Sequence, residues 1–361
     1  MLGTLRKHII VGNTKIGGGA AVTVQSMTTV KTSDVPGTVA QINRLAELGC
    51  DIVRVAVPDM AAADAIGEIK NRISIPLVAD IHFDYKLAVR AAEAGADKIR
   101  INPGNIGCDE NVRAVADICG KKGIPIRVGV NGGSISKEIL AKHGGLTPDS
   151  MYDSALENIR LLNKFDFDDI CVSVKTSSVT LTIAAYKLLY ERMDYPLHLG
   201  VTEAGTERMG TVKSSIGIGA LLAEGIGDTI RVSLTAPPER EVEAALMILR
   251  ALGLRKDYEL ISCPTCGRCG IDLIPIAMEV ERRLAALNLN ITVAVMGCSV
   301  NGPGEASRAD YGITGGNGVG IIFKKGIIYK KVTMNSLIDE LFIAIESGEN
   351  LLERAKTGIS I

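Results

Sequence analysis

The chain has 361 residues, of which 47% are hydrophobic and 4% aromatic, and it contains no tryptophan. A formal net charge of -1 gives the whole chain no attraction for nucleic acid or an anionic membrane, and so few aromatic residues argue against a base-stacking surface. We find no run of about 18 apolar residues that could span a bilayer and no signal-peptide pattern. We therefore expect a cytoplasmic protein with one large and one smaller domain.

Short apolar runs alternate with amphipathic stretches up to about Arg255. The runs cover residues 21–27, 51–57, 76–82, 97–102, 125–131, 169–175, 196–202 and 228–234. About eight β-α units in roughly 250 residues match a (β/α)8 TIM barrel. A doubly wound open sheet is the alternative, but no glycine-rich dinucleotide fingerprint follows the first strand. The sequence thus predicts an α/β fold with a TIM barrel over residues 1–255, which we expect to bind the substrate.

The remainder, residues 256–361, has a different rhythm and predicts a small α/β domain. We expect strands at 259–263 and 291–297, separated by a helix at 271–288. A glycine-rich loop is predicted at 301–320, then a hairpin at 320–332 and an amphipathic helix from about Asn335. The late cysteines come just after the two predicted strands of this domain.

The predicted barrel strands carry polar side chains at alternating positions. In the run 97–102, Lys98, Arg100 and Asn102 share one face and oppose the two isoleucines. Because the outward face of a barrel strand packs under helices, the polar face must line the lumen. The same parity in the other runs assigns to the lumen Arg54, Asp80, His82, Arg127, Asn131, Ser173, Lys175, His198, Thr202, Arg231 and Ser233.

This predicted lumen is strongly cationic, and buried cations need compensation. An internal salt-bridge network, to which Glu203 and Glu207 could contribute, is one explanation. The explanation we favour is a site for a multiply charged anion, a phosphate or diphosphate, near the carboxyl ends of the strands. In that site, Arg127 and Arg100 would act as bidentate forks, Lys175 as a point charge, and Asn102 and Asn131 as neutral donors.

Cysteines occur in two groups. The four scattered ones, Cys50, Cys108, Cys119 and Cys171, lie among apolar or small residues, and we expect buried or partly buried thiols. The late group is Cys263, Cys266, Cys269 and Cys298.

The late group indicates a metal site. A zinc site formed by all four thiols is one possibility, since structural zinc usually has four Cys or His ligands. The other is an iron–sulfur cluster held by three thiolates, Cys263, Cys266 and Cys298, with Glu305 as a harder fourth ligand. The glycines around Cys298, in MGCSVNGPGEA, allow the backbone to approach a bulky cluster closely.

Long segments resemble one enzyme family. SCPTCGR (262–268) and MGCSVNGPGEA (296–306), followed by ADYGITGG, resemble the signature of the 4-hydroxy-3-methylbut-2-enyl diphosphate synthases. These are iron–sulfur reductases of the methylerythritol phosphate route to isoprenoids. The resemblance extends along essentially the whole chain, through VQSMT (24–28), ADIHFD (79–84), RINPGN (100–105), RVGVNGGS (127–134) and LGVTEAG (199–205). The length is that of the bacterial two-domain form.

The resemblance implies a [4Fe-4S] cluster bound by Cys263, Cys266, Cys298 and Glu305, without Cys269. It implies reductive ring opening and dehydration of 2-C-methyl-D-erythritol 2,4-cyclodiphosphate to 4-hydroxy-3-methylbut-2-enyl diphosphate. Glu203 would donate a proton to the leaving hydroxyl, and Glu305 would be an exchangeable ligand. The residues expected to bind substrate are Arg54, His82, Arg100, Asn102, Arg127, Asn131, Lys175 and Arg231.

The resemblance also implies partners. Flavodoxin or ferredoxin would supply electrons, and a head-to-tail homodimer would place the small domain of one chain over the barrel of the other.

Two other functions stay open. The chain could be an electron carrier or redox sensor with a scaffold barrel, although a scaffold would be filled with aliphatic side chains. It could instead be a zinc-stabilised barrel enzyme acting on a phosphorylated or pterin-like substrate, which colour and metal content would distinguish.

Overall fold

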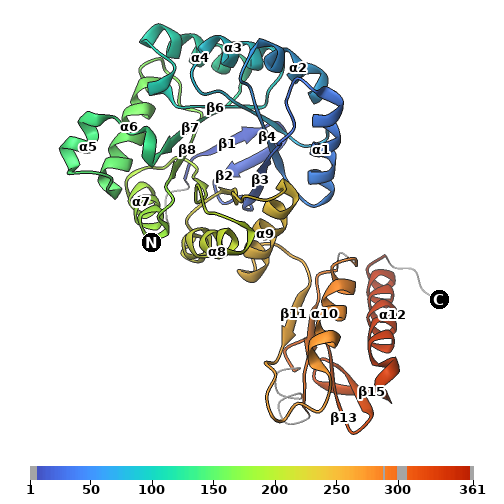
Figure 1. Ribbon diagram of the computed structural model, residues 1–361. Helices are drawn as coiled ribbons and strands as arrows, with labels where there is room; N and C mark the ends of the chain where they lie inside the picture. The colour runs from blue at the N-terminus through green and yellow to red at the C-terminus, as the bar shows by residue number, and fades with distance from the viewer. Residues whose placement is uncertain (1–5, 288, 299–306, 358–361) are drawn as a thin grey trace. The chain divides into compact units, whose positions relative to one another are not determined.

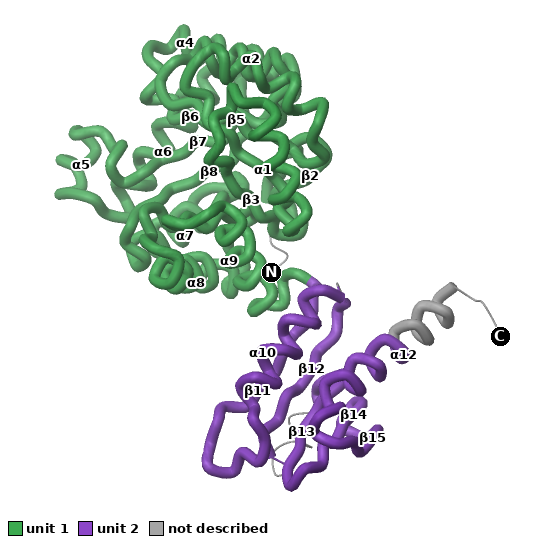
Figure 2. The backbone as a smooth tube through the Cα atoms, turned by 45° about the vertical axis from the view of Figure 1, so that its right-hand side comes forward, with its two compact units in different colours: residues 1–255 green, residues 256–361 purple. Residues whose placement is uncertain are grey.

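The structure, a computed structural model, describes residues 6–287, 289–298 and 307–357, with side chains described up to residue 348. The chain divides into two compact units, Met1–Arg255 and Lys256–Ile361, shown in green and purple in Figure 2. Each unit has a hydrophobic core of its own.

The first unit is a barrel of parallel strands, as the sequence predicts. Its strands are hydrogen-bonded in the order β8-β7-β6-β5-β4-β3-β10-β9. The two ends meet through a parallel bridge between Val172 and Leu197 and a Val172 N–H bond to the Pro196 carbonyl at 2.9 Å. Each predicted run contains one strand: β3 Thr23–Met27, β4 Ile52–Ala56, β5 Leu77–Asp80, β6 Lys98–Ile101, β7 Ile126–Asn131, β8 Ile170–Lys175, β9 His198–Leu199 and β10 Thr229–Ile230.

Helices surround these strands (Figure 1). Many begin where a short polar side chain caps the first turn; Asp59, for example, accepts the Ala62 N–H at 2.8 Å and starts α2. The helices are α1 Val35–Glu47, α2 Met60–Lys70, α3 Tyr85–Glu93, α4 Asp109–Lys122, α5 Lys137–His143, α6 Pro148–Asn163, α7 Val179–Arg192, α8 Glu207–Ala223 and α9 Pro238–Ala251. The connection from β7 to β8 therefore contains two helices, α5 and α6.

A short hairpin, which the sequence analysis does not predict, closes the end of the barrel where the strands begin. It consists of β1 (His8–Val11) and β2 (Thr14–Gly17), paired antiparallel. Its fully or almost fully buried side chains form one cluster with the first lumen-facing residues of three barrel strands: Ile9, Val11, Ile16, Ile52, Val78 and Cys171. The glycine run that starts at Gly17, the last residue of β2, ends this strand.

In its described residues, the second unit has a five-stranded sheet and the helices α10 (Leu273–Leu284) and α12 (Leu337–Thr357). The order is β11-β12-β13-β14-β15; the first three strands are parallel, and β14 and β15 are antiparallel neighbours. The bounds are β11 Glu259–Ser262, β12 Thr292–Val295, β13 Tyr311–Gly316, β14 Val319–Lys324 and β15 Ile327–Thr333.

One prediction in this unit is wrong. The glycine-rich stretch expected to be a loop contains strand β13. Its glycines permit close packing: a Cβ at Gly315 would lie 2.7 Å from the Met334 sulfur, and one at Gly320 in β14 would lie 2.7 Å from a Leu337 methyl. Glycine in this stretch therefore marks a close approach between the sheet and the segment that leads into α12.

The scattered cysteines are buried at positions 50, 119 and 171, whereas Cys108 is exposed. Cys108 precedes α4 as its N-cap, and this position corrects the prediction of a buried thiol. Among the described residues, no helix has the length and apolarity needed to cross a membrane.

Candidate active site

The polar strand residues of the barrel converge on a small cavity of about 110 Å³ at the carboxyl ends of the strands. Arg54, Asp80, Arg100, Arg127 and Lys175 lie on five consecutive strands, β4 to β8. The cavity is lined by these residues together with His82, Asn131, Ser173, Thr202, Arg231 and Ser233. Parity along the strands therefore places most of the predicted set in one site, since every second side chain of a barrel strand faces the lumen. Lys98, Asn102 and His198 do not line this cavity.

Asp80 is the central carboxylate of this cavity. It accepts a hydrogen bond from Arg100 at 3.1 Å and lies 3.6 Å from the Arg54 Nε. Burial by itself would raise the pKa of Asp80, but Arg54, the hydrogen bond from His82 and Arg100 together hold it well below its usual range. The His82 ring is 58% exposed and lies 3.5 Å from Asp80. Asp80 is thus fixed as an anion that orients two arginines.

Glu241, on α9, is a second buried carboxylate that the sequence analysis missed. Its oxygens accept from Arg231 at 3.1 Å and from the Leu234 N–H at 3.0 Å. The sequence predicted that Glu203 and Glu207 could neutralise the lumen, but Arg231 pairs with Glu241, and Glu207 lies 3.8 Å from Arg240. A signal was present: Glu241 shares the buried face of α9 with Ala244, Ala245 and Ile248.

The remaining cations have little compensation within the described residues. The Lys98 Nζ and Arg127 Nε atoms are buried there without a hydrogen-bond partner. Burial, with repulsion from neighbouring cations, lowers the pKa of Lys98 to about 8 and that of Arg127 to about 10, and it holds the pKa of Lys175 well below its ordinary value. A multiply charged anion would relieve this repulsion.

Two glycines leave room for the Arg100 and Lys175 side chains, which come from neighbouring strands. A Cβ on Gly129 would lie 2.7 Å from the Arg100 Nε, and one on Gly200 would lie 2.6 Å from the Lys175 Nζ. Such contacts are too short for a real side chain, so the cations occupy the space that other residues at these positions would fill. The absence of a side chain at these two positions thus leaves room in the lumen for both cationic groups.

A second cavity, of about 320 Å³, shares Asn131 and Thr202 with the cation-lined one and contains Glu203. Glu203 has a φ of 53°, a left-handed conformation that is uncommon for a non-glycine residue. Asn102, in contrast, does not line either cavity: it is 5% exposed, directly after β6, and its side-chain oxygen has no hydrogen-bond partner among the described residues.

The cysteine loops of the second unit follow two adjacent parallel strands. Ser262 of β11 is in register with Val295 of β12, so Cys263 and Gly297–Cys298 leave the sheet at the same edge. The Gly297 N–H donates to the Cys263 sulfur at 3.1 Å. The backbone N–H of Arg268, and then its side chain, lower the pKa of Cys266. The Arg268 donors thereby favour the thiolate of Cys266, the form of cysteine that binds metal.

Cys269 lies close to the same loops. Its thiol donates to the Ile271 carbonyl at 3.2 Å, and a Cβ on Gly297 would lie only 2.6 Å from its sulfur and 3.4 Å from that of Cys263. The described residues contain no group of three Cys, His, Asp or Glu side chains arranged to hold a metal ion. Glu305, the predicted fourth ligand, lies outside the described residues.

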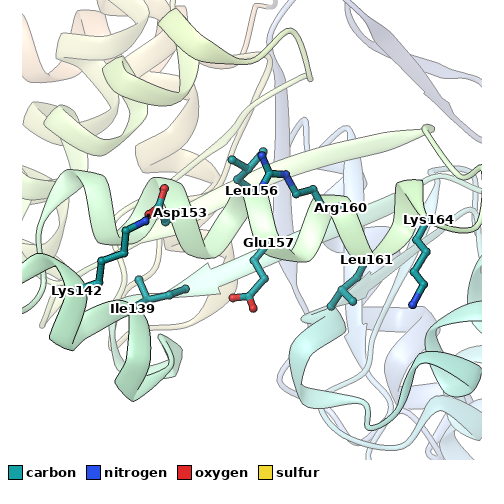
Figure 3. Close-up of a pocket in the computed structure, with 8 residues that line it drawn as sticks. All are labelled: Ile139, Lys142, Asp153, Leu156, Glu157, Arg160, Leu161 and Lys164. Atoms are coloured by element: carbon teal, nitrogen blue, oxygen red, sulfur yellow. Dashed lines mark hydrogen bonds and ion pairs between the residues drawn. The ribbon is translucent and has the colours of Figure 1, made fainter.

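A larger hollow of about 460 Å³ lies elsewhere, on the outer surface between α5 and α6 (Figure 3). Lys142 points toward Asp153 there, with their charged atoms 2.6 Å apart. The lining carries both signs of charge and contains no predicted site residue: Ile139, Lys142, Asp153, Leu156, Glu157, Arg160, Leu161 and Lys164. The cation-lined cavity therefore remains the better candidate.

Comparison with known proteins assigns both units. The family model described as the GcpE TIM-barrel domain matches residues 6–246, and the one described as the GcpE protein C-terminal domain matches residues 259–347. A relative from Caldanaerobacter subterraneus, named 4-hydroxy-3-methylbut-2-en-1-yl diphosphate synthase (flavodoxin), is 60% identical over 95% of this chain and 97% of its own length. A relative of the same name from Bacillus subtilis is 57% identical, over 94% and 90%.

One solved structure is similar to part of this chain. A type I 3-dehydroquinate dehydratase from Clostridium difficile superimposes with a TM-score of 0.52 at 15% identity, covering 69% of this chain and 98% of the other. At this identity the likeness concerns the fold only. The two matched domains and the nearly full-length relatives together show that this chain belongs to the GcpE family.

Proposed function

We propose that this protein converts 2-C-methyl-D-erythritol 2,4-cyclodiphosphate to 4-hydroxy-3-methylbut-2-enyl diphosphate with two electrons delivered through a [4Fe-4S] cluster. The observation that carries the proposal is the set of buried cations around the cavity at the barrel mouth, in a chain whose relatives bear the name of this synthase. A cyclic diphosphate supplies the anionic charge that these cations lack.

The proposed reaction suits a site in which cations outnumber anions. Two C–O bonds break, one to the ring phosphate and one to a hydroxyl, while two electrons enter and a C=C bond forms. The freed phosphate oxygen retains a negative charge, and a proton converts the leaving hydroxide to water. Because anionic charge grows on the phosphate, cations held in fixed positions stabilise the transition state more than the substrate.

The lumen residues have distinct roles in this proposal. Arg54, Arg100, Arg127, Lys175 and Arg231 bind the diphosphate, with Arg54 and Arg100 oriented by Asp80 and Arg231 by Glu241. His82 and Asn131 make further polar contacts with the substrate, and the Asn102 backbone carbonyl accepts the Asn105 N–H at 2.8 Å in the loop after β6. Glu203, in the adjoining cavity, donates the proton to the leaving hydroxyl.

The cluster ligands proposed are Cys263, Cys266, Cys298 and Glu305, with Cys269 beside them. When bound, the cluster supplies the two electrons. The N–H groups of Gly297 and Arg268, directed at the sulfurs of Cys263 and Cys266, support thiolate ligation. We propose flavodoxin as the donor because the relatives' names specify it, and we place the reaction in the cytoplasm, where thiols stay reduced.

The first experiment is the visible spectrum and the metal content of anaerobically purified protein. Broad absorption near about 400 nm with roughly four irons per chain is expected for the cluster, followed by turnover of the cyclodiphosphate with reduced flavodoxin. Glu305→Ala should fold but hold the cluster less stably and turn over far more slowly. A colourless protein that takes up zinc, and no iron on anaerobic reconstitution, would contradict the proposal.

Arg127→Ala tests the anion site separately. It should weaken substrate binding strongly while leaving the cluster spectrum unchanged, because Arg127 belongs to the barrel unit. A changed spectrum with unchanged affinity would show that the barrel cations do not bind the substrate.

We further propose a homodimer in which active sites are shared between chains, as the family resemblance implies. Mixing inactive Arg127→Ala protein with inactive Cys298→Ser protein should restore part of the activity, since one type of site then combines an intact barrel with an intact cluster. No recovery, under conditions where subunits exchange, would refute sharing.

A further inference from the structure

The cavity beside the cation-lined site differs from it in chemistry. Its lining comes from the loops that follow β7, β8 and β9: Asn131, Gly132, Gly133, Ser134, Leu146, Thr176, Ser177, Thr202 and Glu203. No cation is among these residues, and one large apolar side chain, that of Leu146, is. Because Asn131 and Thr202 line both cavities, the two cavities adjoin at the barrel mouth.

Leu146 lies in the connection between helices α5 and α6. Helix α5 ends at Gly144, which has a φ of 69°, and the Gly145 N–H bonds to the Leu140 carbonyl at 2.8 Å. On the other side, Thr147 caps α6 by accepting the Ser150 N–H at 3.1 Å. Gly145 and Leu146 therefore lie between the residue that caps the end of α5 and the residue that caps the start of α6.

The Leu146 side chain lies over the turn that follows β7. A Cβ on Gly132 would be 3.0 Å from a Leu146 methyl group. The side chain nevertheless stays 42% exposed, so it does not belong to the packed core of the barrel. A leucine held at the wall of a polar cavity has apolar surface available for a ligand.

We infer that Leu146 contacts the methyl branch of the substrate and thereby determines specificity for the methylated cyclodiphosphate. This inference rests on the proposed function. With the diphosphate among the cations, the carbon skeleton extends into the adjoining cavity, where Ser134, Ser177 and Thr202 suit its hydroxyl groups. Leu146 is the apolar partner that this cavity provides for the remaining methyl group.

The test compares the natural substrate with erythritol 2,4-cyclodiphosphate, which lacks the methyl branch. Wild-type enzyme should favour the methylated compound by about tenfold or more in kcat/KM, the usual effect of one apolar group in a fitted pocket. Leu146→Ala should reduce this preference to about twofold, chiefly by lowering kcat/KM for the methylated compound. Leu146→Met, which keeps apolar volume at the position, should retain most of it.

Leu254→Ala is the matched control. Leu254 is 40% exposed, close to the value for Leu146, but it lines a different cavity with Arg6, Gly18 and Asp228, where the barrel strands begin. It should leave the preference unchanged. An unaltered preference in Leu146→Ala would overturn the inference while leaving the proposed function intact. Failure of the reconstituted wild-type enzyme to bind or convert either compound would instead overturn the proposed function, and this inference with it.

Discussion

Lys98 carries an ammonium group that is fully buried and has no hydrogen-bond partner among the described residues. Burial lowers its pKa from 10.5 to about 8. Between these pH values the unfolded chain keeps a proton that the folded chain has lost, so this lysine's contribution to the free energy of unfolding rises with pH across that window. Below about pH 8 the buried cation destabilises the fold at its full strength.

Lys98→Met should therefore stabilise the ligand-free protein at pH 7, by about 3 kcal/mol as judged from the pKa shift, and raise Tm by several degrees. The gap between variant and wild type should close as pH rises from about 8 to 10.5. Thermal unfolding across this range measures both effects, with Lys121→Met on the exposed side of α4 as a control that stays level with wild type. A variant less stable than wild type at pH 7 would mean that the ammonium has a stabilising partner.

Glu203 is the residue whose role can be read most directly from kinetics. Glu203→Gln should lower kcat by about 10²- to 10⁴-fold, the usual range for a lost general acid, while KM changes little because the diphosphate is bound by other residues. Glu203→Asp should recover part of the rate. If Glu203→Gln retained wild-type kcat, another group would be the proton donor.

Several of these residue positions could be predicted from sequence, and the reason is strand parity. Arg54, Arg100, Arg127 and Lys175 alternate with buried aliphatic residues, so the lumen is the remaining direction for them. Glu241 lies on a helix outside the barrel strands, so strand parity gives no signal for it. The position of Leu146 could not be foreseen, because two helix ends fix it and the length of α5 is not encoded in any periodicity.

At the level of elements, β11 and β12 position the cysteine loops. Gly297 is the contact point between these loops, with room for no side chain next to the Cys269 sulfur. Gly297→Ala should therefore displace the thiols and greatly reduce iron uptake on anaerobic reconstitution. Gly316→Ala, at the end of the neighbouring strand β13 with nothing within 4 Å of the added methyl, should load iron normally.

The double variant Gly297→Ala/Cys269→Ala then distinguishes the two ligand sets. Removing the Cys269 sulfur makes room for the alanine methyl, so iron uptake should recover if Cys269 is not a ligand. Continued loss of iron in the double variant, together with loss in Cys269→Ala alone, would favour the four-thiol site.

The prediction of secondary structure was wrong where glycine can serve two structural purposes. The same residue that favours a turn also lets two elements approach closely, and β13 uses it for the second purpose. The N-terminal hairpin escaped prediction because β1 and β2 are four residues each, too short for alternation to stand out. Its buried partners Ile52 and Cys171 lie far along the chain.

At the scale of the whole molecule, the separate cores of the two units predict separate responses to ligands. A ligand stabilises the unit that binds it, by about 2.7 kcal/mol at a hundredfold excess over Kd. In calorimetry of the cluster-loaded protein, the cyclodiphosphate should raise the transition of the barrel by about 5–10 °C. Loss of the cluster should lower the transition of the other unit, which contains Cys263, Cys266 and Cys298.

Arg127→Ala serves as the control in this measurement, since it should abolish the substrate-induced shift without moving the cluster-dependent one. A single transition that responds equally to both ligands would mean that the two units unfold together.

The β1–β2 hairpin has a consequence for how substrate enters the barrel and how product leaves it. With Ile9, Val11 and Ile16 packed against the first lumen-facing residues, the hairpin covers the end of the barrel where the strands begin. Substrate, product and the water produced would therefore enter and leave at the carboxyl ends of the strands, where the cation-lined cavity lies.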